Sequence, residues 1–229
     1  MPSLKDLRNR ISSVKSTKKI TSAMKMVAAA KLKRAQDNAE RSRPYANKMK
    51  DIVISLISRS NTDNLKFSKT NNKKKTVLLI VCSADRGLCG GFNGSIIKHT
   101  KNLTDTLKKN GKNFKFLFVG KKAYQSLRRL YKDLTIDLVS DFANPRIEFE
   151  IASSIRDQVL KLFFDSEISE CYLIYTKFKS AISQNVESQK LLPVEKDYQQ
   201  DSHPKTVMYD FEPNEEIILD DIIPRNIAI

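Results

Sequence analysis

The sequence of 229 residues contains few of the side chains that build metal centres or disulfide frameworks. Its three cysteines, Cys82, Cys89 and Cys171, are odd in number and form no CxxC pair, so we expect neither a disulfide framework nor a zinc site. The two histidines, His99 and His203, are far apart and have no cluster of cysteines or carboxylates beside them. We therefore expect no metal ion and no cofactor, and a reducing compartment for the chain.

Long apolar runs are also missing. No stretch approaches the roughly 18–20 apolar residues of a helix that spans a membrane, so we do not expect the chain to be an integral membrane protein. The N-terminus, MPSLKDLRNR, has charges but no apolar core after them, which excludes a secretory signal. Six glycines and seven prolines exclude collagen-like and low-complexity chains. What is present is 40% hydrophobic residues, enough for the core of one or two compact domains.

The positive charge is distributed unevenly along the chain. Residues 1–50 hold 14 basic and three acidic side chains, whereas residues 191–229 hold three basic and nine acidic ones. A basic arm and an acidic end suggest partners of opposite charge. A solvated basic face without a partner is the alternative interpretation.

The basic arm has an apolar repeat typical of a long coiled-coil helix. In steps of three and four residues from Leu4 to Leu56, 12 of 16 positions are apolar, and a shift of one residue leaves only four. A 3.5-residue period predicts a helix that supercoils with another helix, here about 80 Å long. No other part of the chain has a matching repeat, so the partner helix is on another chain or missing from this one.

The repeat is interrupted between residues 18 and 27. There the seam positions become polar, and the apolar face shifts to Ile20, Met24 and Val27. A local phase shift of the coiled coil is one explanation. The other is that this turn meets a different surface from the rest of the helix.

After a polar linker at 60–75, the chain alternates between strand-like and helix-like segments. Strands separated by helices predict an α/β fold with a largely parallel sheet. We expect strands at 76–83, 114–120, 170–178 and 189–194, and helices at 96–110, near 121–132 and from Asn144-Pro145 onward.

The loop at 84–95 is the one candidate for phosphate chemistry. It contains four glycines between a strand and a helix, but their spacing is neither GxGxxG nor GxxxxGK[ST]. A tight turn explains the glycines better than a nucleotide does, although it leaves Arg86 and Cys89 at the tip unexplained. We find no paired carboxylates and no Ser/His/Asp or Cys/His set, so we do not expect an enzyme.

Four segments of the sequence form a pattern when taken in order: ITSAMKMVAAAKLKRAQ at 20–36, RPYA at 43–46, DRGLCGGFN at 85–93 and YDFEPNEE at 209–216. In this order and spacing they resemble the γ subunit of F-type ATP synthases, and the resemblance covers the whole chain. It implies a non-catalytic rotor whose N- and C-terminal helices form an antiparallel coiled coil inside a ring of α and β subunits. A small Rossmann-like α/β domain would form the foot, which docks on ε and the c-ring, so that proton-driven rotation cycles the catalytic β sites.

The resemblance also assigns contact residues by position. Met24 and Lys25 fall where the family's shaft passes an acidic loop of β, and this accounts for the polar interval. Six residues fall in contact segments in all: Met24, Lys25, Arg86 and Cys89 beside the acidic loop of β, and Tyr209 and Glu212 near ε and the c-ring.

The expected organisation is a shaft helix at 1–59, the linker at 60–75, the foot at 76–212 and the start of a return helix at 213–229. Because the chain stops at DDIIPRNIAI, where the family continues with a second long helix, we expect a truncated return helix. The arm would then be frayed or self-associating and would not couple proton flow to ATP synthesis until that helix is supplied.

Localisation and rival functions follow from the same features. Without a presequence we expect a peripheral protein at the cytoplasmic face of a bacterial inner membrane, with an organelle inner membrane as the alternative. The basic arm also suits a nucleic-acid-binding coiled coil, but it lacks aromatic interleaving and a groove-reading motif. A nucleotide-binding α/β enzyme is the third possibility.

Overall fold

The computed structural model describes residues 3–59, 66–68, 75–142, 147–180, 183–194 and 215–229. These residues form two compact units, Met1–Lys50 and Asp51–Ile229. The first helix crosses the boundary, so its last turns belong to the α/β unit. We describe each unit by itself.

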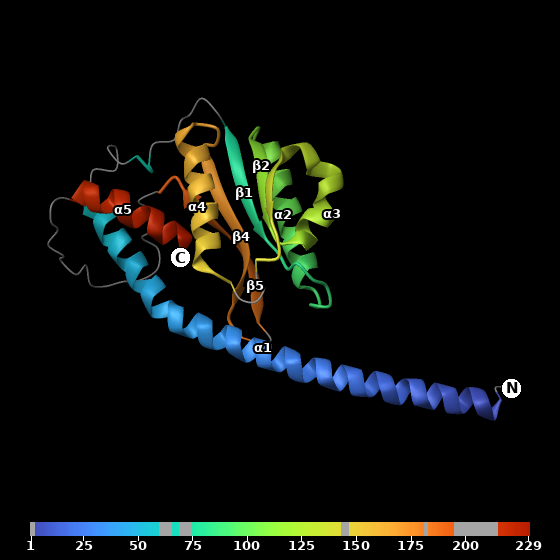
Figure 1. Cartoon of the computed structure of the whole chain (residues 1–229). Helices are drawn as coiled ribbons and strands as arrows, with labels where there is room; N and C mark the ends of the chain where they lie inside the picture. Colours follow the sequence, from blue (N-terminus) through green and yellow to red (C-terminus); the bar gives the residue numbers. More distant parts are fainter. Residues whose placement is uncertain (1–2, 60–65, 69–74, 143–146, 181–182, 195–214) are drawn as a thin grey trace. The chain divides into compact units, whose positions relative to one another are not determined.

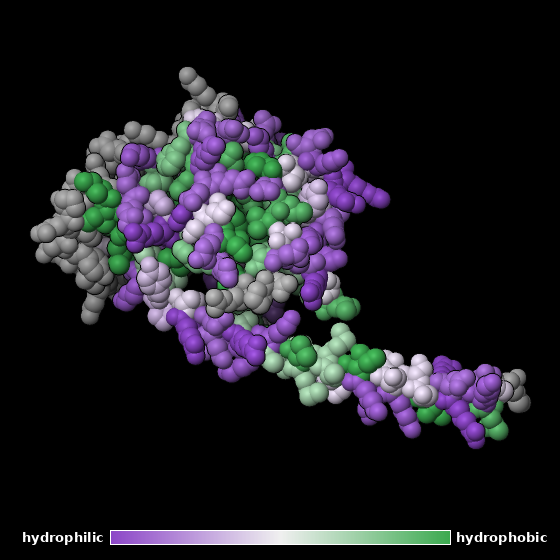
Figure 2. Space-filling model, viewed as in Figure 1, coloured by the Kyte–Doolittle hydropathy of each residue, from purple (hydrophilic) through white to green (hydrophobic). Residues whose placement is uncertain are grey.

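The first unit is one helix, about the first thirteen turns of α1 (Leu4–Arg59). A capping box starts it: the Asp6 amide donates to the Ser3 hydroxyl (3.2 Å), and the Ser3 amide donates to the Asp6 carboxylate (3.1 Å). Apolar and polar side chains alternate along the helix (Figure 2). The apolar seam of this unit is exposed to solvent, as at Leu4 (77%), Ile11 (55%) and Val14 (62%).

The second unit is built on a five-stranded sheet with the order β3-β2-β1-β4-β5. The first four strands are parallel, and β5 is antiparallel to β4 at the edge. This confirms the predicted α/β fold with a mostly parallel sheet. The strands are β1 (Thr76–Cys82), β2 (Asn113–Val119), β3 (Thr135–Val139), β4 (Glu170–Phe178) and β5 (Gln184–Leu192).

Helices cover both faces of the sheet, as Figure 1 shows. Along β1, alternate residues enter two cores: Leu79 packs on the face of α2 and α3, and Leu78 packs on the face of α4 and α5. This is the period-2 pattern of a strand buried on both sides. The helices are α2 (Phe92–Lys109), α3 (Lys121–Tyr131), α4 (Phe149–Phe164) and α5 (Glu215–Ala228).

Two details of the predicted sheet were wrong. Strand β3 was not predicted, because it is short, only partly buried and interrupted by the exposed Asp137. The last strand was predicted at 189–194, whereas β5 runs from Gln184 to Leu192. The first half of β5 is polar and at most half-buried, so it lacks the apolar run of a strand that is buried on both faces. The helix predicted from Asn144-Pro145 begins at Phe149, and residues 143–146 lie outside the described part.

The last turns of α1 and the helix α5 share the core on the α4 face. Leu56 and Leu219 are both fully buried there, and Ile223 is 1% exposed. Phe67, from the segment expected to be a polar linker, is buried in the same core, and its carbonyl accepts a hydrogen bond from the Val194 amide at 3.0 Å. The seam of α1 thus ends inside the α/β unit.

Candidate subunit interface

The glycine-containing loop lies at the carboxyl edge of the sheet, between β1 and α2. Asp85 fixes its first half: one carboxylate oxygen accepts the Lys121 amide (3.0 Å), and the other accepts the Asp141 amide (2.9 Å). These amides follow the ends of β2 and β3. A single half-buried carboxylate therefore ties the loop to two neighbouring strands.

Asn93, in the first turn of α2, holds the second half of the loop. Its amide oxygen accepts the Ala84 amide at 3.0 Å, and its amide nitrogen contacts the Cys89 sulfur at 2.9 Å. The same nitrogen lies 3.5 Å from the Arg86 carbonyl. The tip that carries Arg86 and Cys89 is thus anchored from both sides.

The tip itself presents its side chains to solvent. Arg86 and Cys89 are exposed, and Leu88 between them is 98% exposed. Leu88 also has a positive φ of 62°, an uncommon conformation for a bulky residue. An apolar side chain held outward by a strained, anchored backbone is typical of a surface that contacts another protein.

The turn between β2 and α3 packs closely under this loop. The Ser83 amide donates to the Val119 carbonyl (2.7 Å), and its hydroxyl donates to the Gly120 carbonyl (3.1 Å). Gly120 has φ 97°, and a Cβ there would lie 2.0 Å from the Ser83 carbonyl oxygen. Only glycine fits this crossing of two chain segments.

The start of α3 is occupied by the chain's own acceptors, which argues against a phosphate site there. The amide of Lys121 donates to Asp85, that of Lys122 to the Ala84 carbonyl (3.1 Å), and that of Ala123 to the Ser83 hydroxyl (3.0 Å). These are the donors that a bound anion would use. The start of α3 therefore offers no open amide among these three to an anion.

An ion pair closes the same edge of the sheet. The Lys121 ammonium contacts the exposed Asp141 carboxylate and holds the pKa of that carboxyl below its usual value. Arg86 contributes to the same lowering through its charge. The loop tip, the start of α3 and the end of β3 therefore form one electrostatically coupled surface.

The other predicted contact residues lie elsewhere. Met24 is 55% exposed and Lys25 is exposed, both in the first unit, whereas Arg86 and Cys89 belong to the second. Tyr209 and Glu212 lie outside the described residues. The structure brings Arg86 and Cys89 together on one loop tip.

Asp85, Asn93 and Gly120 were not predicted from the sequence as functional residues. Asp85 and Asn93 lie within the DRGLCGGFN motif, but their partners lie up to 56 residues away in the chain. Gly120 follows an apolar strand, and a glycine between a strand and a helix is a recognisable signal for a special backbone conformation. The Asp141 amide that bonds to Asp85 follows β3. Because β3 was not predicted, this contact of Asp85 could not be predicted either.

The described residues offer neither a metal site nor a membrane span. Among them no group of three or more histidine, cysteine or acidic side chains could hold a metal ion. No helix in the described part is long and apolar enough to cross a membrane.

Comparison with known proteins places the chain in a family. The family model described as ATP synthase matches residues 3–229. The ATP synthase gamma chain of Sinorhizobium medicae is 44% identical over the whole chain, which covers 79% of that relative's length. That of Pelagibacter ubique is 41% identical with the same coverage.

A solved structure agrees in fold. A chain of the central stalk and c-ring structure of the Tetrahymena thermophila mitochondrial ATP synthase matches with a TM-score of 0.66 and 30% identity, covering 91% of this chain and 88% of that one. The alternative of a nucleic-acid-binding coiled coil finds no support in these relatives. The chain belongs to the ATP synthase gamma chain family.

Proposed function

We propose that this gamma chain turns with a proton-driven c-ring and passes the rotation to the catalytic β subunits. The chain is a structural rotor subunit of the central stalk and is not itself catalytic. The observation that carries the proposal is the exposed heptad seam of α1, with Leu4, Ile11 and Val14 all more than half exposed. A seam of this kind is buried by a partner helix and by the ring of subunits around the two helices.

We place the contact with the catalytic subunits at two basic sites. Met24 and Lys25 lie on the exposed arm, and Arg86 and Cys89 lie on the exposed loop tip. Positive charge at both sites suits an acidic loop of β, because opposite charges steer and orient a contact. The anchoring of the tip by Asp85 and Asn93 keeps that contact from yielding when torque is applied.

The remaining partners are assigned by resemblance. Tyr209 and Glu212 would contact ε and the c-ring, and the α subunits would complete the ring around α1. As a gamma chain the protein is a peripheral part of a membrane-bound complex. The cytoplasmic face of a bacterial inner membrane is the location we propose.

Charge reversal tests the two basic contact sites. We expect Lys25→Glu and Arg86→Glu each to weaken binding of the chain to assembled α and β subunits about tenfold or more, because like charges then face each other. Lys31→Glu and Lys98→Glu are the matched controls, since both side chains are exposed and lie on other faces of α1 and α2. Equal losses in test and control variants would contradict the assignment of these contacts.

A second measurement tests the rotor role itself. The purified chain should hydrolyse no ATP, whereas hydrolysis by complexes containing it should drive rotation of the chain. Turnover by the chain alone, after every other subunit is removed, would overturn the proposed function.

A further inference from the structure

A basic surface lies at the end of the sheet opposite the loop at 84–95. It consists of the last turn of α2, the last turns of α3 and the first residue after α3, and we call it the basic end. All its side chains are exposed, and Figure 2 shows hydrophilic residues gathered over α3. Its members are Lys108, Lys109, Arg128, Arg129 and Lys132.

Tyr131 joins the two helix ends into one surface. Its ring lies 5.4 Å from the Lys108 ammonium, and its hydroxyl is 3.3 Å from that of Thr104. The Lys108 ammonium also lies 5.7 Å from the ring of Phe114 in the neighbouring strand β2. Lys108 of α2 therefore lies over aromatic rings that include Tyr131, the last residue of α3, so the basic ends of the two helices are neighbours.

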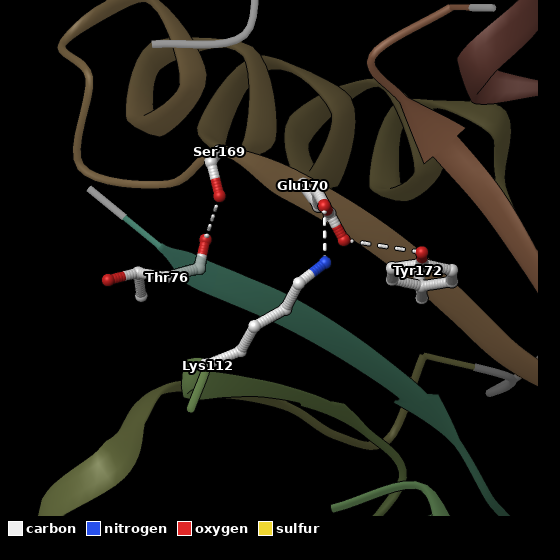
Figure 3. A network of polar contacts seen from close by, with 5 residues as sticks. All are labelled: Thr76, Lys112, Ser169, Glu170 and Tyr172. Carbon is white, nitrogen blue, oxygen red and sulfur yellow. Dashed lines mark hydrogen bonds and ion pairs between the residues drawn. The ribbon is translucent and has the colours of Figure 1, made fainter. Parts of the chain in front are cut away.

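Two acidic residues near this edge are engaged away from the basic end, whereas Asp105 and Asp133 lie beside it in the chain, both exposed and outside any ion pair among the described residues. Glu170 accepts the Lys112 ammonium at 2.6 Å and lies 3.3 Å from the Tyr172 hydroxyl (Figure 3). Glu167 pairs with Lys115 at 3.0 Å. Within the described residues, no ion pair joins a carboxylate to any member of the basic end. Its positive charge is thus left for a partner.

Helix stability explains only part of this arrangement. Basic residues in the last turn of a helix interact favourably with the helix dipole, and this applies to Lys108 and Lys109 on α2 and to Arg128 and Arg129 on α3. It does not account for the two leucines of the same surface, Leu130 at 63% exposed and Leu134 at 38%. Exposed leucines among basic side chains are typical of a surface that lies against a membrane interface.

We infer that the basic end binds the headgroups of anionic phospholipids, with Leu130 and Leu134 against the acyl boundary. The positive charge suits both an anionic lipid and an acidic protein loop, and the exposed leucines favour the lipid surface, because an acidic loop would leave them without a role. The inference relies on the proposed function only in that the complex supplies a membrane nearby. It is tested without any other subunit, so its failure is distinct from a failure of the rotor role.

Vesicle sedimentation of the full chain tests the inference at about 0.15 M salt, where charges are screened beyond about 8 Å. The wild-type chain should bind vesicles of phosphatidylcholine with 30% phosphatidylglycerol and not vesicles of phosphatidylcholine alone. Since each basic side chain near such a surface raises partitioning about fivefold, Arg128→Gln/Arg129→Gln/Lys132→Gln should lower it about 100-fold. Leu130→Ser should lower it severalfold with the charge unchanged.

The control removes the same charge elsewhere. Lys5→Gln/Arg8→Gln/Lys15→Gln neutralises three exposed residues of α1 and should change partitioning less than fivefold, and Arg128→Lys/Arg129→Lys should leave it unchanged. Equal losses in both neutral triple variants would overturn the inference by showing general attraction of a basic chain. Unchanged vesicle binding with lost binding to the other subunits would overturn it in favour of an acidic protein surface. Should the triple variant not fold, the single changes Arg128→Gln and Lys132→Gln carry the test, with about fivefold losses expected.

Discussion

The carboxylate of Asp85 accepts a hydrogen bond from the backbone amide of Asp141, 56 residues further along the chain, at 2.9 Å. Its second oxygen accepts the Lys121 amide at 3.0 Å. Both acceptors of one side chain are therefore used by amides that follow two different strands, and this bridge sets where the loop tip with Arg86 points.

Asp85→Asn tests the bridge. Asparagine keeps one acceptor and places an N–H₂ group against the other amide, so we expect a loss of about 1–3 kcal/mol in the free energy of unfolding. Urea unfolding at neutral pH measures it. Asp133→Asn is the control, because Asp133 is exposed and has no hydrogen-bond or ion-pair partner within the described residues. Equal small effects of both changes would show that the bridge contributes nothing.

The glycines of the second unit allow a matched comparison. Gly120→Ala places a Cβ 2.0 Å from the Ser83 carbonyl oxygen at a φ of 97°, and we expect a loss of roughly 2–5 kcal/mol in stability. Gly94→Ala, in the first turn of α2 with nothing within 4 Å of its Cβ, should be neutral or stabilise by up to about 1 kcal/mol. Thermal unfolding of the two variants checks the difference, and equal melting temperatures would contradict it.

The seam of α1 allows the same kind of comparison with leucine. Leu56 is fully buried and Leu4 is 77% exposed, although both are seam positions of one repeat. We expect Leu56→Ala to cost about 2–5 kcal/mol in the free energy of unfolding and Leu4→Ala to cost less than about 0.5 kcal/mol in the isolated chain. Unfolding in urea gives both values. A large effect of Leu4→Ala would mean that its seam is already buried in the isolated chain.

Two kinds of element could be predicted from the sequence: strands that are apolar nearly throughout, and a helix with a regular apolar repeat. The runs at 76–82 and 113–119 are apolar nearly throughout, and both were placed within about a residue of β1 and β2. The long helix was predicted from its repeat and observed from Leu4 to Arg59. Period and burial are properties of short windows, so one sequence suffices to find them.

The contact geometry could not be predicted in this way. The seam repeat is the same at Leu4 and Leu56, yet only Leu56 enters the α/β core, because burial depends on what packs against the helix. Likewise the role of Asp85 depends on amides that follow β2 and β3, and β3 was missed because Asp137 interrupts its apolar pattern. The motif located the loop, but only the topology identifies its anchors.

The three thiols should differ sharply in reactivity. Cys171 is buried, and burial raises the pKa of the Cys82 thiol to about 12 and that of Cys171 upward as well. The thiolate is the reacting form, so at pH 8 the thiols of Cys82, which is half-buried, and Cys171 stay protonated, whereas Cys89 is exposed on the loop tip. We expect a maleimide to modify one cysteine per folded chain, Cys89, and all three in urea, as peptide mass mapping would show. Cys89→Ser should remove labelling of the folded chain, and labelling of Cys171 without denaturant would contradict its burial between β1 and β5.

In complexes with the β subunit, we expect slower modification of Cys89, because the proposed contact would cover this thiol. An unchanged rate would count against that contact while leaving the argument on the burial of the other two thiols intact.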